Sequence, residues 1–143
     1  MSKIVQSNLD DYPEAAKKHL DDANALFQAG RSDGCGYLVG YVIECIFKTF
    51  FVLEGERTPD IHILDQLSRD ASRLAAMAGA KTAKYAFRLP RRHPLYDRRR
   101  GWRTGLRYRA VGTVAAKDAA DWLAEATQLY NSTIVPMRLD GLV

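Results

Sequence analysis

Apolar residues recur every three to four positions along most of the chain, and this spacing predicts helices rather than strands. The first helix is expected to follow Asp11, which can cap it, with Pro13 in its first turn, and to end at Ala29 before Gly30. Charged residues occupy one side of this helix. Its apolar stripe consists of Ala16, Leu20, Ala23 and Phe27.

A second helix is predicted over residues 32–53, and almost every side of it is apolar. Such a helix belongs in the middle of a bundle, where neighbours cover all its faces. Gly36 and Gly40 would let a neighbouring helix approach closely, since neither has a side chain to hold it away. Glu44 and Lys48 lie one helical turn apart and can pair with each other.

The second half of the chain alternates helix and loop. A third helix is expected over residues 61–78, and residues 82–87 can add a short turn. Two prolines prevent a continuous helix over residues 88–101, which form a long loop. The last helix is expected over residues 113–134, until Pro136 breaks it. The pattern predicts one all-α domain spanning residues 1–143, an antiparallel up-and-down bundle of four to five helices.

The composition fits an ordinary globular domain, with 47% hydrophobic and 27% charged residues. The first ten residues contain no signal-peptide pattern, and the most apolar stretch, residues 37–53, falls short of the roughly 20 residues that span a bilayer. We therefore expect a cytoplasmic protein with no membrane contact. The three histidines, His19, His62 and His93, are scattered singly, so we expect no metal and no cofactor.

Positive charge is concentrated in residues 88–109, which contain nine arginines and a single acid, Asp97. This segment carries +8, so the rest of the chain must carry −4 to give the net charge of +4. All nine cations are arginine, whose planar guanidinium suits bidentate contacts with phosphate and stacking on bases. Four aromatic residues are interleaved with them, Phe87, Tyr96, Trp102 and Tyr108.

Arginines and aromatic rings in one segment favour a surface that binds RNA or nucleotide phosphates. Two other interpretations remain open at this stage. The aromatic residues can anchor the loop on the bundle, and the arginines can pair with acids of the first helix or of a partner chain. The residues expected to bind the ligand are Arg98, Arg99, Arg100, Trp102, Arg103, Arg107 and Tyr108.

Several short motifs in a fixed order resemble the HEPN family, the higher eukaryotes and prokaryotes nucleotide-binding domain. The second helix contains a Gly40-Tyr41 pair followed by Glu44 and, one turn later, Lys48. Further matches are Gly30-Arg31 after the first helix, Pro59-x-x-His62-x-Leu64 before the third, and Trp102 with Arg107-Tyr108 before the last. The resemblance covers residues 12–135 and rests on the motifs together.

The resemblance implies a bacterial helical bundle that forms a homodimer and works in toxin–antitoxin, defence or nucleotidyltransferase-linked systems. It also implies metal-independent RNA cleavage in those members that carry an arginine followed four to six residues later by a histidine near the final helix. In such a pair the histidine moves protons and the arginine stabilises the phosphate. Here no histidine follows Arg107 within residues 108–114, so we expect a member that is not an enzyme.

Three alternatives stay open. A ribonuclease with a relocated pair would use Arg88, Arg92 and His93, although Pro90 interrupts any helix between them. A second spacing match, Arg57 to His62, also encloses a proline. A protein-interaction role would dock the basic loop on an acidic antitoxin or a nucleotidyltransferase. A last group, Tyr41, Glu44, Lys48 and His62, can line a pocket, although an ion pair within the bundle and a structural histidine are the favoured explanation.

Overall fold

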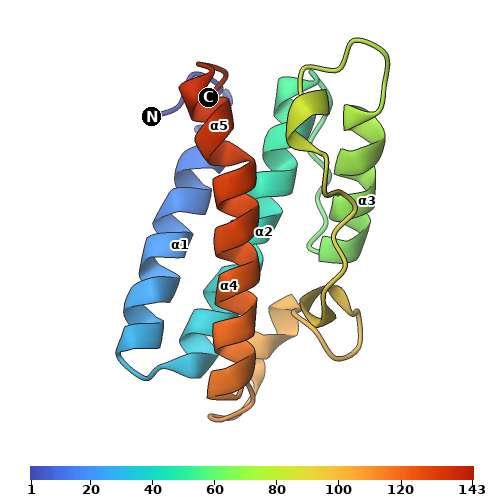
Figure 1. Cartoon of the computed structure of the whole chain (residues 1–143). Helices are drawn as coiled ribbons and strands as arrows, with labels where there is room; N and C mark the ends of the chain where they lie inside the picture. Colours follow the sequence, from blue (N-terminus) through green and yellow to red (C-terminus); the bar gives the residue numbers. More distant parts are fainter.

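The computed structural model describes all 143 residues, and it contains helices and no strand. The expected all-α bundle is therefore confirmed. α2 is central, because it contacts the other three long helices, and Figure 1 shows α1 and α4 on one side of it and α3 on the other. The helices are α1 (Tyr12–Gln28), α2 (Ser32–Leu53), α3 (Leu64–Ala75), α4 (Ala116–Ser132) and α5 (Ile134–Leu139).

The helix directions differ from the predicted up-and-down arrangement. α1 runs opposite to α2, but α3 and α4 run in the same direction as α2 (Figure 1). Two contacts fix this topology. Asp33, at the start of α2, accepts hydrogen bonds from Gly112 and Val114 just before α4, and Glu54, after α2, accepts from Thr82 beyond α3. The long segments 54–63 and 76–115 return along the bundle, so consecutive helices need not alternate.

α2 provides more of the core than any other helix, with 14 of its 22 residues buried. It is also long and apolar enough, by length and composition alone, to cross a bilayer. Most of its apolar window, 72%, is nevertheless buried by the other helices, as is usual for the central helix of a bundle. The apolar character of α2 is therefore explained by its burial in the bundle. The sequence argument that residues 37–53 are too short to span a bilayer does not apply to the whole helix.

Gly36 and Gly40 of α2 each lie against side chains of neighbouring segments. A Cβ added at Gly40 would lie 1.8 Å from Cε2 of Trp102, so the indole occupies the space that a side chain would need. A Cβ at Gly36 would lie 2.8 Å from Cγ1 of Val114 and 3.4 Å from Cε3 of Trp122. At Gly40 the close neighbour is a loop residue and not the expected helix, whereas at Gly36 Trp122 of α4 and the adjoining Val114 approach closely; both positions need glycine.

Helix boundaries follow the sequence signals within a few residues. The Asp11 side chain caps α1 by accepting from the backbone N–H of Glu14, and α2 has the predicted bounds. α3 and α4 are shorter than expected at both ends. Pro136 lies inside α5 and not beyond the last helix, because the break comes earlier, at Thr133. A proline in the first turn of a helix is tolerated, since the N–H groups there have no partner in the helix.

The long segment between α3 and α4 contains three short 3₁₀ turns: η1 (Ala83–Tyr85), η2 (Pro94–Tyr96) and η3 (Thr104–Tyr108). η1 confirms the turn expected at residues 82–87. The other two lie within the arginine segment, defined here as residues 88–109. This segment is therefore an ordered part of the fold, and its contacts determine where its arginines point.

Candidate functional site

The tip of the arginine segment is a closed loop between Leu95 and Trp102. The N–H of Trp102 donates to the carbonyl of Leu95 at 2.9 Å, and the N–H of Gly101 donates to that of Asp97 at 2.8 Å. The Asp97 carboxylate accepts from the backbone N–H groups of two following arginines, which hold its pKa below the usual value. These bonds fix the backbone of Arg98–Arg100, so three guanidinium groups extend from a rigid base.

Trp102 anchors this loop on α2. Its side chain is buried, with 4% of the residue exposed, and its Nε1 donates to the carbonyl of Tyr37 at 2.8 Å. The ring packs edge-on against Tyr41, with 5.1 Å between centroids. The predicted ligand contact of Trp102 therefore needs correction, because a ring enclosed by α2 offers no free face to a base. The anchoring alternative describes its position.

A buried ion pair anchors the other side of the loop on α4. The guanidinium of Arg91 donates to both oxygens of Glu125, at 2.7 and 2.8 Å, and the hydroxyl of Tyr96 donates to the same carboxylate at 2.8 Å. Burial opposes ionisation of Glu125, but these hydrogen bonds and the charge of Arg91 hold its pKa below the usual value. The N–H of Arg91 also donates to Ser68 of α3, so the loop is tied to two helices.

Most of the arginines have no acidic partner. Only Arg91 and Arg98 lie within 4 Å of a carboxylate, and the contact of Arg98 with Asp65 is long, at 3.6 Å. Neither partner belongs to α1, so the alternative that acids of the first helix neutralise the segment does not hold. Seven arginines remain without a carboxylate: Arg88, Arg92, Arg99, Arg100, Arg103, Arg107 and Arg109.

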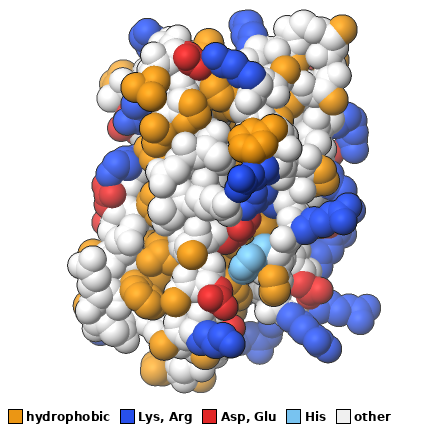
Figure 2. Space-filling model, in the orientation of Figure 1, with side chains coloured by type: hydrophobic (Ala, Val, Ile, Leu, Met, Phe, Trp, Pro, Cys, Tyr) orange, Lys and Arg blue, Asp and Glu red, His pale blue; other side chains and the backbone are white.

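These free cations are exposed and gather on one part of the surface. Every one of the seven is exposed to solvent. Figure 2 shows lysine and arginine side chains, those of other segments included, over the right and lower parts of this face. Phe87 and Tyr108 are the exposed aromatic residues of the region, at 69% and 78%. Arg88 stacks on the ring of Phe87, 5.2 Å from its centroid, and Arg107 stacks on that of Tyr108 at 4.8 Å.

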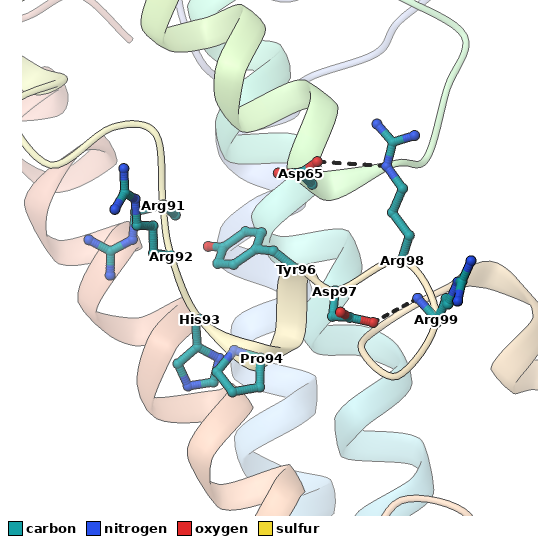
Figure 3. Close-up of a pocket in the computed structure, with 9 residues that line it drawn as sticks. All are labelled: Asp65, Arg91, Arg92, His93, Pro94, Tyr96, Asp97, Arg98 and Arg99. Atoms are coloured by element: carbon teal, nitrogen blue, oxygen red, sulfur yellow. Dashed lines mark hydrogen bonds and ion pairs between the residues drawn. The ribbon is translucent and has the colours of Figure 1, made fainter.

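Arginines line both sides of an open groove between η2, α3 and the loop tip. Figure 3 shows Arg91 and Arg92 on one side, Arg98 and Arg99 on the other, and the Tyr96 ring between them. The groove has a volume of about 580 Å³, and Asp65 and Asp97 are its acidic residues. Both carboxylates are engaged, Asp97 by backbone N–H groups and Asp65 by Arg69 at 2.9 Å. The groove therefore presents cations and can hold an anion.

The residues proposed for a relocated ribonuclease pair meet only in part. Arg92 and His93 line the same groove, whereas Arg88 is not among the residues that line it. Nδ1 of His93 accepts a hydrogen bond from the backbone N–H of Leu95 at 3.1 Å, which caps η2. The neutral ring then carries its proton on Nε2 and has no free lone pair to remove a proton from a substrate. In this position His93 suits a hydrogen-bond donor better than a general base.

The four residues predicted to line a pocket, Tyr41, Glu44 and Lys48 of α2 and His62 before α3, do lie together in the structure. Glu44 is buried, and its two oxygens bind different partners: Lys48 Nζ at 2.7 Å and His62 Nδ1 at 2.8 Å. The ring of Tyr41 lies 6.3 Å from that of His62, and burial, followed by the hydrogen bond with Tyr37, raises the Tyr41 pKa. Only His62 of these four residues lines a cavity. The group is an ordered ion-pair network with one exposed member.

Sequence reasoning missed Glu125, which holds the loop. Its signal was present: Glu125 lies three residues after Trp122 and four before Leu129, on the apolar stripe of the last helix. A carboxylate at such a position needs a cation or several donors, and Arg91 and Tyr96 supply both.

Neither Arg107 nor any other arginine lies in α4, which also contains no histidine. α4, the last long helix, thus has no counterpart of the arginine–histidine pair. Comparison with protein-family models, with curated proteins and with solved structures yields no match. The function of the chain therefore has to be argued from its own geometry.

Proposed function

We propose that this protein is a HEPN-like helical module of the bacterial cytoplasm that binds RNA, or the phosphates of a nucleotide, through its arginine segment and does not cleave its ligand. The observation that carries the proposal is the set of seven exposed arginines without a carboxylate partner. Of the two arginines that do have partners, Arg91 is buried against Glu125 and holds the loop, whereas Arg98 contacts Asp65 only at 3.6 Å and stays exposed.

The distribution of charge supports a polyanionic ligand. Like charges held close together repel each other, and a phosphate backbone relieves this repulsion while releasing its own counterions. The loop tip is closed by backbone hydrogen bonds, so little conformational entropy is lost when its arginines bind. Exposed Tyr108 and Phe87 each carry a stacked arginine on one face, and an unpaired base can stack on such rings.

The proposed lack of catalysis by the Arg92–His93 pair rests on the hydrogen bond of His93, and α4 contains neither arginine nor histidine. A base that removes the proton of a ribose hydroxyl needs a free nitrogen lone pair, and in the neutral ring of His93 that lone pair is used by Leu95. A homodimer, and a neighbouring nucleotidyltransferase or antitoxin as partner, follow from the family resemblance and form part of this proposal. Size-exclusion chromatography with light scattering tests the dimer.

A salt titration tests the binding. We expect the affinity for a labelled single-stranded RNA to fall linearly on a log–log plot against salt, with a slope of roughly −0.7 for each phosphate neutralised. Replacing Arg98, Arg99 and Arg100 by glutamine should reduce that slope by about two and weaken binding at low salt at least tenfold. Since these side chains are exposed, the variant should keep the stability of the wild type.

A charge-matched control separates a specific surface from net charge. Lys18, Lys81 and Lys117 are exposed and make no salt bridge, so replacing all three by glutamine removes the same charge elsewhere. This control variant should bind nearly as well as the wild type. If both triple variants bind alike, or if wild-type affinity does not depend on salt, the proposed function is wrong.

A further inference from the structure

The space between the start of α3 and η3 forms a second, smaller cavity beside the arginine groove. It has a volume of about 250 Å³, and its buried wall consists of Leu64, Tyr96 and Trp102. Polar groups surround this wall: the imidazole of His62, the guanidinium groups of Arg98 and Arg103, and the hydroxyl of Thr104. Tyr96 and Arg98 line both cavities, so the two lie next to each other.

We propose that this cavity, called here the His62 pocket, binds a terminal phosphomonoester, and the proposal rests on the function proposed above. The ligand class follows from the charge and from the shape of the pocket. Two guanidinium groups and an imidazole converge on it, and a dianionic phosphate accepts several charge-assisted hydrogen bonds at once. A terminal phosphate is attached to the nucleic-acid chain on one side only, so it can enter a recess. An internal phosphodiester carries a nucleotide on each side, and both nucleotides would have to bend away before it could enter.

The buried Glu44 positions His62 for this role. Its carboxylate accepts from Nδ1 of the imidazole at 2.8 Å, which leaves Nε2 for a ligand. Glu44 is itself paired with Lys48 at 2.7 Å, so its negative charge is already compensated inside the bundle. The His62 side chain is 47% exposed, in contrast to 7% for Glu44, so the ring reaches solvent from a fixed base. In its charged form Nε2 donates to a phosphate oxygen.

The backbone N–H groups at the start of α3 and the paired carboxylate of Asp65 are both compatible with an anion bound in this pocket. Ile63 precedes α3 and provides no side-chain cap, so the N–H groups of the first turn, at residues 64–66, have no acceptor in the protein. Asp65 lies in this turn, and its carboxylate is contacted by Arg69 at 2.9 Å and by Arg98 at 3.6 Å. Arg103 has no carboxylate within 4 Å, and its guanidinium is held by the carbonyl of Arg99 at 2.6 Å.

Matched oligonucleotides test the proposal. We expect a single-stranded RNA with a 5′- or 3′-terminal phosphate to bind about tenfold more tightly than the same RNA with hydroxyl ends, the effect of one or two charge-assisted hydrogen bonds. His62→Gln should remove this preference and leave the affinity for the hydroxyl-ended RNA unchanged. His93→Gln, a matched change in the neighbouring groove, should keep the preference. Equal binding of both RNAs by the wild type, or a preference that survives His62→Gln, would overturn the inference.

A second measurement is independent of RNA binding. Titration with inorganic phosphate, followed by the NMR signals of the three imidazole rings, should shift the His62 signals in the millimolar range and leave those of His19 in place. If hydroxyl-ended RNA shows no salt-dependent affinity but phosphate shifts His62, the pocket stands and the RNA-binding function fails. If phosphate does not shift His62, the pocket is refuted whatever the RNA does. A nucleoside monophosphate added as competitor then shows whether a free nucleotide or an RNA end is the better source of the phosphate.

Discussion

Gly40→Ala is the smallest change that should detach the arginine segment from the bundle. The new methyl carbon would lie 1.8 Å from Cε2 and 2.2 Å from Nε1 of Trp102, far inside van der Waals contact. The backbone of α2 cannot yield, because this helix packs against α1, α3 and α4. The indole must therefore move, and with it the hydrogen bond to the carbonyl of Tyr37 is lost.

The size of the effect follows from two opposing contributions. Complete loss of a buried tryptophan side chain costs about 3–5 kcal/mol, which is an upper limit for its displacement. Alanine favours the helix over glycine by about 1 kcal/mol. We therefore expect Gly40→Ala to lower the free energy of unfolding by about 2–4 kcal/mol, which lowers Tm by roughly 6–12 °C for a chain of this size.

Urea denaturation followed by circular dichroism measures this change. Fluorescence in a Trp122→Phe background should show the emission of Trp102 moving to longer wavelength, because the displaced ring meets water. Gly34→Ala is the control, since its Cβ would meet only the flexible end of Leu26, at 3.1 Å, and should change stability by less than about 1 kcal/mol. A Gly40→Ala protein with wild-type stability and unchanged Trp102 emission would refute the packing argument.

Two further changes test the anchors of the loop. Glu125→Gln leaves Arg91 buried without a counter-charge and should cost about 3 kcal/mol at pH 7. The pKa of Glu125 is lower in the folded state than its ordinary value of 4.5, so the ionised carboxylate stabilises the fold above pH 4.5 and this stabilisation is lost as pH falls through the folded-state pKa. The stability of Glu125→Gln, measured by urea denaturation, should therefore depend less on pH below 4.5 than that of the wild type. Gly101→Ala places a Cβ 2.2 Å from the carbonyl oxygen of Leu95, so it should open the loop and weaken RNA binding at least tenfold at unchanged net charge; anisotropy titrations that match the wild type would exclude a role for loop rigidity.

Local signals in the sequence were sufficient for the elements and for the concentration of arginine in the loop. The cap at Asp11 and the largely apolar run of residues 32–53 each depend on neighbours within a few positions, and both α1 and α2 begin at the predicted position. The density of arginine in residues 88–109 was also a local property. Exposure of these side chains follows directly, because one acidic residue cannot neutralise nine cations.

Properties that depend on long connections could not be read from the chain. Helix direction is one of them, since residues 54–63 and 76–115 are long enough to return along the bundle, and the apolar pattern is the same for both directions of a helix. The partner of Gly40 is another, because a small residue on a central helix accommodates a helix backbone or an indole from a loop equally well. Trp102 was thus assigned to the ligand surface when it belongs to the core.

The motifs found separately along the sequence form one structural unit around Tyr41. Its ring contacts Trp102 at 5.1 Å and His62 at 6.3 Å between centroids, while Gly40 beside it admits the indole and Glu44 one turn later holds the imidazole. Residues of α2 thus hold two other segments in place. Trp102 attaches the arginine loop to α2, and His62 attaches the segment before α3 to Glu44. A side chain at position 40 would therefore displace the tryptophan that holds the arginine loop, and loss of Glu44 would release the imidazole of His62.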